Sequence, residues 1–159
     1  MRVLALGKRR GCLRATSASV WLARGVALEG RSPEQAMAAY RRALAGQPGL
    51  ADAHNNLGRL LHERGELAAA EHHYRQALAA EATALHWFNL GVVLEDSGHV
   101  DAAIDAYGQA IDVQAEFVEA HLNVARLLDQ RGRSRDATGD LQAAVRHLTA
   151  VRRLRRTHA

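Results

Sequence analysis

The chain of 159 residues repeats itself, and this repetition limits its fold more than any other feature of the sequence. Gly65, Gly98 and Gly132 lie 33 and 34 residues apart, and each follows an apolar segment with the spacing of one helix face. We expect each of these glycines to end a helix in the left-handed conformation. Each period therefore predicts a helix, a turn and a second helix.

The pattern within one period is clearest between residues 84 and 115. Small residues at Gly91 and Ala103 allow two helices to approach closely, while Leu94 and Tyr107 fill the space beside them. The other positions of this period are Trp87, Leu90 and Ala110; the second period has His54, Leu57, Gly58, Leu61, Ala70, Tyr74 and Ala77, and the fourth has His121, Val124, Ala125, Leu128, Ala137, Leu141 and Ala144. One such hairpin cannot bury its apolar side alone, so at least three must stack.

The predicted helices follow from this periodicity. They span about 19–29, 33–46, 51–64, 67–80, 84–97, 100–113, 118–131 and 134–155. The first period is the weakest, because aligning Trp21 with Trp87 puts one extra residue in the turn at 30–33 and places Arg24 where Leu90 lies. Without that insertion Trp21 loses its match, and the register of the first repeat stays open.

The spacing Trp-x2-Leu-Gly-x2-Leu, followed by Ala-x3-Tyr, resembles the tetratricopeptide repeat, whose period is 34 residues. The resemblance covers about residues 18–150 and implies an all-α fold, a right-handed α-solenoid of about four helix–turn–helix units that binds other proteins. The expected organisation is a disordered basic arm at 1–16, a solenoid at 17–150 and a basic extension of the last helix at 151–159. The expected repeats are about 17–50, 51–83, 84–117 and 118–150.

The net charge of +4 is unevenly distributed. Residues 1–16 carry five basic residues and no acid, residues 146–159 do the same, and residues 17–145 have 11 Arg against 17 Asp and Glu. An acidic body does not favour nucleic acid as a partner. In the last helix we expect Arg152 and Arg153 to face water, while Val151 and Leu154 cover apolar surface, so that the end of the array is polar.

Three asparagines form the most regular polar feature of the repeats. Asn56, Asn89 and Asn123 each lie two residues before the small residue of the tight helix contact. The repeats resemble those of O-linked N-acetylglucosamine transferase, in which an Asn at this site contacts the backbone of an extended peptide. An amide both donates and accepts, so it can bind any peptide unit. Alternatively, these side chains hydrogen-bond only the neighbouring repeat. The candidate peptide-binding residues are Asn55, Asn56, Arg59, Phe88, Asn89, Val92, Leu122, Asn123 and Arg126.

The sequence has no pattern typical of catalysis. It lacks a Ser/His/Asp arrangement, a phosphate-binding glycine loop and a zincin helix, so we expect no enzymatic activity, no cofactor and no metal. His54 and His121 occupy the position of Trp87, which indicates packing. Cys12 is the only cysteine, no transmembrane segment is predicted, and a cytoplasmic location is the default expectation.

We therefore predict a non-enzymatic adaptor that binds an extended peptide of a protein partner. The alternative is the sensor or interaction part of a bacterial transcription regulator, with the basic ends contacting nucleic acid. The identity of the partner and the oligomeric state stay open.

Overall fold

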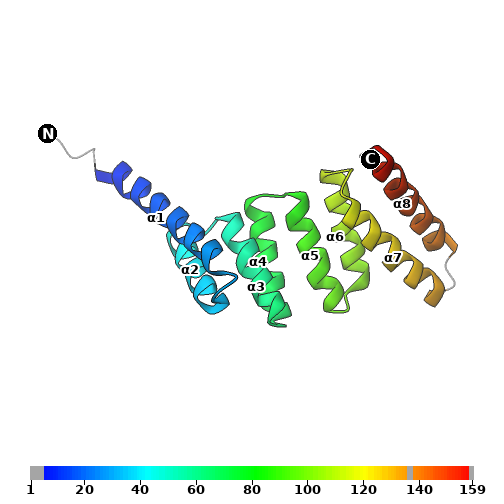
Figure 1. The fold of residues 1–159 in the computed structure, drawn as a ribbon, viewed down its shortest axis with the longest axis horizontal. Coiled ribbons are helices and arrows are strands. Elements are labelled where there is room, and N and C mark those ends of the chain that lie inside the picture. Colours follow the sequence, from blue (N-terminus) through cyan, green and yellow to red (C-terminus); the bar gives the residue numbers. More distant parts are fainter. Residues whose placement is uncertain (1–5, 136–137, 158–159) are drawn as a thin grey trace. The chain divides into compact units, whose positions relative to one another are not determined.

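The computed structural model describes residues 6–135 and 138–157, with side chains described from residue 17 to 134 and from 138 to 156. These residues form eight α-helices and no strand (Figure 1). The chain divides into two compact units, Met1–Glu81 and Ala82–Ala159, each of which holds two helical hairpins. The all-α class and the four helix–turn–helix units predicted from the sequence are confirmed.

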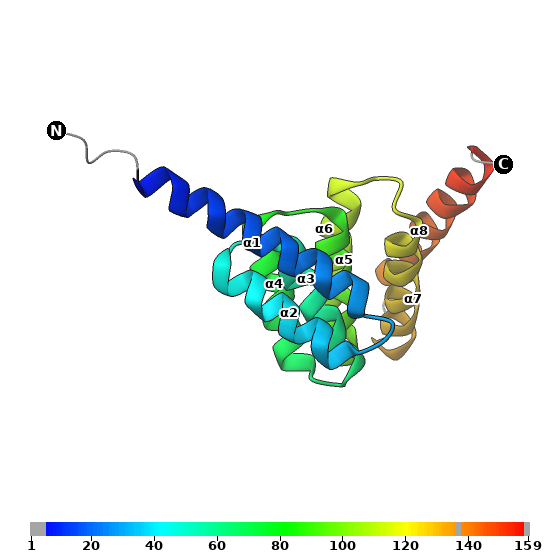
Figure 2. The same ribbon diagram turned by 60° about the vertical axis from the view of Figure 1, so that its left-hand side comes forward.

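The first unit contains α1 (Leu6–Leu28), α2 (Pro33–Gly46), α3 (Ala51–Glu63) and α4 (Leu67–Ala80). Helices α1 and α2 form one hairpin, α3 and α4 form the next, and α2 packs against α3. The second unit repeats this arrangement with α5 (Ala84–Asp96), α6 (Val100–Val113), α7 (Val118–Arg135) and α8 (Thr138–Thr157). There α6 packs against α7, and α7 lies beside α8 (Figure 2).

The small and large residues of the repeat meet as the sequence predicts. Tyr40, Tyr74 and Tyr107 are among the largest fully buried side chains. A Cβ atom added to Gly58 would lie 3.0 Å from the ring of Tyr74, and one added to Gly91 would lie 2.6 Å from the ring of Tyr107. The ring of the tyrosine therefore occupies the space that a side chain at the glycine would need.

The first repeat follows the same rule, which resolves its register. A Cβ atom on Gly25 would clash with the ring of Tyr40, so Gly25 corresponds to Gly91 and Trp21 to Trp87. The connection between α1 and α2 has four residues, 29–32, whereas the connection at 97–99 has three. The extra turn residue that this alignment requires is present.

Two of the three predicted turn glycines have the expected conformation. Gly65 and Gly98 have φ values of 78° and 79°. The amide of Gly98 donates to the carbonyl of Glu95 at 2.8 Å, and the amide of His99 donates to that of Leu94 at 2.8 Å, which is the Schellman pattern of helix termination. Gly65 and the residue after it make the same pair of bonds.

The third prediction of this kind is wrong. Gly132 is buried inside α7, which continues to Arg135. Arg131 donates to both carboxylate oxygens of Asp140 at 2.6 and 2.8 Å and to Asp101 at 2.6 Å. These charge-assisted bonds stabilise the last turns of α7, which stays helical through the glycine as far as Arg135.

The first helix is also longer than predicted. It begins at Leu6, whereas the apolar periodicity indicated a start near Ser19. Residues 6–16 contain no proline and several good helix formers, so nothing in them prevents a helix. Residues 1–5 of the predicted basic arm lie outside the described residues, as do residues 158–159 of the predicted C-terminal extension. The boundaries of both segments stay predictions.

Candidate protein-binding surface

The nine candidate binding residues lie on the first helix of three repeats. Helix α3 carries Asn55, Asn56 and Arg59, α5 carries Phe88, Asn89 and Val92, and α7 carries Leu122, Asn123 and Arg126. All are at least partly exposed except Asn55, which is 8% exposed and donates a hydrogen bond to Asn56 at 3.3 Å. Since Asn55 has so little surface, a ligand would meet this part of α3 through Asn56 and Arg59.

In the first unit, Asn56 and Arg59 join a cluster that connects two repeats. The hydroxyl of Tyr40 in α2 donates to the carboxylate of Glu29, and the amide of Asn56 also hydrogen-bonds this hydroxyl. Arg59 pairs with Glu29 at 2.5 Å and with Glu63 one turn further along α3. Burial raises the pKa of Tyr40, and the hydrogen bond to Glu29 adds to this effect, so the phenol stays protonated.

The second unit contains the same cluster. Tyr107 in α6 donates to Glu95 at 3.1 Å, Asn123 in α7 hydrogen-bonds the hydroxyl of Tyr107, and Arg126 pairs with Glu95 at 2.5 Å. Burial and the neighbouring carboxylate raise the pKa of Tyr107. The two units therefore contain the same arrangement, in which an Asn and an Arg of the later repeat bind a Tyr and a Glu of the earlier repeat.

These contacts decide what Asn56 and Asn123 do in the unliganded chain. Both amides bond the neighbouring repeat, and their role in binding a peptide stays a prediction. The sequence analysis did not identify Glu29 and Glu95 as partners. The sequence did contain a signal. Each Glu lies four residues after the small residue of its own repeat, and each Arg lies one residue after the small residue of the following repeat. The second repeat has His62 at the acid position, and the third has Val92 at the arginine position.

Phe88 provides the apolar part of the surface on α5. Its ring lies 5.4 Å from that of Tyr107 and 5.0 Å from that of Phe117, measured between centroids. Both rings are tilted, in the range that aromatic pairs prefer. Phe88 is thus held in place while part of its ring stays accessible.

His54 and His121 have the packing role predicted for them. Their exposed fractions are 9% and 7%, and their Nε2 atoms bond the carbonyl oxygens of Pro48 and Ala115 at 2.9 and 3.0 Å. The Nδ1 atom of His54 lies 2.9 Å from Nδ1 of His73. Burial lowers the pKa of His73 to about 4, and the charges of His54, His72 and Arg41 contribute in the same direction.

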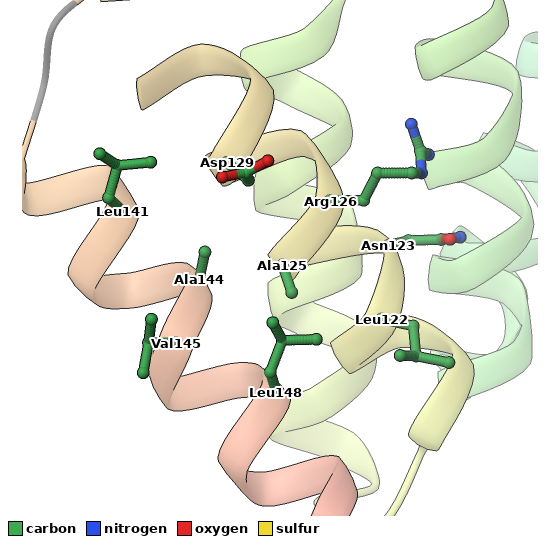
Figure 3. Close-up of a pocket in the computed structure, with 9 residues that line it drawn as sticks. All are labelled: Leu122, Asn123, Ala125, Arg126, Asp129, Leu141, Ala144, Val145 and Leu148. Carbon is green, nitrogen blue, oxygen red and sulfur yellow. The ribbon is translucent and has the colours of Figure 1, made fainter. Parts of the chain in front are cut away.

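A hollow of about 480 Å³ lies between α7 and α8 (Figure 3). Its walls are mostly apolar, with Leu141, Val145 and Leu148 from α8, and Asp129 of α7 lies at its edge. In Figure 3, Asn123 and Arg126 extend from α7 on the side away from α8, whereas Ala125 lies between the two helices. The described helices include none with the length and hydrophobicity needed to cross a membrane.

The fold and these inter-repeat clusters define a helical repeat protein. A family model described as tetratricopeptide repeat matches residues 81–157, and a second model with the same description matches residues 39–72. The chain belongs to the tetratricopeptide repeat family. The tetratricopeptide repeat family predicted from the spacing of small and aromatic residues is thus confirmed.

Several solved structures have the same fold. A crystal structure of MamA is 20% identical, covers 89% of this chain and 80% of its own, and has a TM-score of 0.79. MamA 41-end from Desulfovibrio magneticus RS-1 is 21% identical, covers 88% and 76%, and has a TM-score of 0.73. YrrB, described as a TPR protein with an unusual peptide-binding site, is 20% identical, covers 80% and 66%, and has a TM-score of 0.67.

Proposed function

We propose that this protein is a non-enzymatic adaptor that binds an extended segment of another protein on the first helices of its repeats. The observation that carries the proposal is the band of partly exposed polar and apolar side chains on α5 and α7 of the second unit, held in place by contacts between repeats. In the first unit, α3 has corresponding side chains, Asn56 and Arg59, held in the same way. Membership of the tetratricopeptide repeat family supports it. YrrB, which shares the fold, is described as having a peptide-binding site.

The fixed geometry of the band favours binding. Asn123 and Arg126 are already bonded to the preceding repeat, so a ligand does not have to order these side chains. A surface that is ordered in advance loses less conformational entropy on association. Phe88, Val92 and Leu122 supply apolar contacts, and the amides supply hydrogen bonds that do not depend on the ligand's side chains.

The test needs a ligand, which a phage-displayed library of random peptides selected on the full chain can provide. Binding of the selected peptide is then measured by calorimetry. Asn89→Ala should weaken binding by about two- to tenfold, the value of one hydrogen bond. Val92→Asp should weaken it more, because it places a charge in the contact. Gln109→Ala, on an exposed part of α6, is the matched control and should bind as the wild type does.

The proposal fails if no peptide is selected, or if the selected peptides bind both α5 variants with unchanged affinity. Melting temperatures of all variants separate lost binding from lost folding. A gel shift with duplex DNA at two salt concentrations tests the alternative, since contacts from the basic ends would weaken steeply as salt rises.

A further inference from the structure

The end of the second unit has an apolar face that no described part of the unit covers. Val145 is 61% exposed and Leu148 is 50% exposed, although both lie on the side of α8 that lines the hollow beside α7 (Figure 3). The sequence predicted a polar end to the array. Val151 is buried and Arg152 and Arg153 are exposed, as expected, but the part of α8 nearer its start is not polar.

The equivalent faces of the first and third repeats are covered, and the covering element is the first helix of the next repeat. Helix α3 packs on α2 in the first unit, and α7 packs on α6 in the second. In both cases an Arg of the covering helix pairs with a Glu of the covered repeat: Arg59 with Glu29, and Arg126 with Glu95. The fold therefore shows twice how such a face is occupied.

Asp129 occupies the corresponding position in the fourth repeat. It lies four residues after Ala125, as Glu95 lies four residues after Gly91. Its present partner is Arg133 of the same helix, at 3.0 Å, and the side chain of Arg133 is 75% exposed. Exposed ion pairs of this type contribute little, so Asp129 can exchange this partner for another cation.

The covering helices share a charge pattern that matches this face. Helix α3 contains Asp-Ala-His-Asn-Asn-Leu-Gly-Arg at 52–59, and α7 contains Glu-Ala-His-Leu-Asn-Val-Ala-Arg at 119–126. Each has an acid in its first turn and an Arg seven residues later, which is two turns along the same side of the helix. The face formed by α7 and α8 has the complementary charges. Asp129 lines the hollow described above, and a second hollow, which shares Leu122 and Leu148 with the first, is lined by Arg152, Arg155 and Arg156.

We propose that the face formed by α7 and α8 binds an amphipathic helix of another protein, with an acid in its first turn and an arginine seven residues later. The arginine pairs with Asp129, the apolar side of the helix covers Leu141, Val145 and Leu148, and the acid lies toward the arginines of α8. This surface shares residues of α7, Leu122 among them, with the band of the proposed function, but it includes none of the α5 residues of that band.

A second copy of this chain does not supply such a helix. In its described residues, three helices have this acid and arginine pattern. Helices α3 and α7 already use Arg59 and Arg126 inside their own units, and α2, with Glu34 and Arg41, buries its apolar side in its own unit. Helices α1 and α5 have Val26 and Val92 at the arginine position. The charge pattern therefore favours a helix from a different polypeptide.

The probe is a fluorescent, hydrocarbon-stapled peptide with the sequence of residues 51–63, stapled outside its apolar side, because an unstapled helix of this length is marginal in water. It is titrated against the full chain and followed by fluorescence anisotropy. We expect saturable binding, and an affinity at least about tenfold lower for Asp129→Arg, in which like charges face each other. A peptide with Arg59→Asp should recover most of that loss on the Asp129→Arg chain.

Asp105→Arg is the matched control, since it makes the same charge change at an exposed position of α6 and should leave the affinity unchanged. Melting temperatures of the variants show whether lost affinity comes from misfolding. Asp129→Asn is a milder change at the same position and serves as a second variant for this comparison. Asn89→Ala should not change binding of this peptide, which keeps the test independent of the proposed function.

Absence of saturable binding, or equal affinity for the wild type and Asp129→Arg, overturns the proposal. A dimer in sedimentation velocity that Leu148→Asp dissociates would also overturn it, because a second copy would then cover the face.

Discussion

Removing the hydroxyl of Tyr107 tests whether the inter-repeat cluster stabilises the fold. Tyr107→Phe keeps the ring that fills the space at Gly91, so it opens no cavity. It removes two hydrogen bonds, one donated to Glu95 at 3.1 Å and one shared with Asn123. Because Tyr107 is 0% exposed, a water molecule cannot take the place of the lost hydroxyl group.

The expected loss of unfolding free energy follows from these two bonds. A neutral hydrogen bond contributes about 1 kcal/mol, and one to a charged group contributes about 1.5–3 kcal/mol. Glu95 keeps its ion pair with Arg126. Because the side chain of Glu95 is 23% exposed, water can replace part of the hydrogen bond that Glu95 loses. We therefore expect Tyr107→Phe to lower the free energy of unfolding by about 2 kcal/mol.

Urea unfolding followed by circular dichroism at 222 nm measures this change as a shift of the midpoint at constant slope. Tyr74→Phe is the matched control: Tyr74 is also buried, but the second repeat has His62 where the third has Glu95, so no carboxylate at that position accepts its proton. The control should lose at least about 1 kcal/mol less, since it lacks the bond to a charged group. Equal losses for both variants, or a loss for Tyr107→Phe below about 0.5 kcal/mol, would refute the reasoning.

Three further predictions use other contacts. Gly91→Ala should lower the free energy of unfolding by about 1–3 kcal/mol, because its Cβ would lie 2.6 Å from Tyr107. Gly108→Ala, whose Cβ would have nothing within 4 Å, should raise the free energy of unfolding by up to about 1 kcal/mol. Urea midpoints that move in the same direction for both variants would contradict this prediction. His73 has a pKa lowered from 6.5 to about 4, so the unfolded chain takes up a proton that the folded chain does not, and stability should fall by about 1–2 kcal/mol from pH 6.5 to 4. His73→Gln should flatten this part of the pH profile, and an unchanged profile would exclude His73 as the cause. Ending the chain after Val145 should expose apolar surface of α7 and promote aggregation in light scattering; a monodisperse product with an unchanged melting temperature would show that the removed part of α8 is only an arm.

Much of the fold could be predicted because its determinants are local. The bounds predicted for α2, α4 and α6 are those of the structure. Apolar periodicity fixed their interiors, and Gly65 and Gly98 fixed the turns before two of them. Gly132 misled the same reasoning, because Arg131 is held by carboxylates on α6 and α8, contacts that no short window of sequence contains.

The candidate surface was predicted less completely for a similar reason. Asn56 and Asn123 were identified as the regular polar feature, but their partners lie 16 residues earlier, across a change of repeat. The choice between binding a peptide and bonding the neighbouring repeat depends on whether a buried hydroxyl faces the amide. Only packing that places Tyr40 and Tyr107 against the next first helix answers that question.

The clusters also bear on which ligands the surface can bind. Arg59 and Arg126 each pair with a carboxylate, so the charges of these side chains are already balanced within the chain. A ligand carboxylate would have to compete with Glu29 or Glu95, and a displaced Glu would then face Tyr40 or Tyr107 without its cation. The gain from a new ion pair would therefore be offset by the loss of the old one. Phe88, Val92 and Leu122 do not carry this cost, because an apolar ligand group on them removes surface from water without breaking a bond. We therefore expect peptides selected on the full chain to be enriched in apolar residues and to carry little net charge.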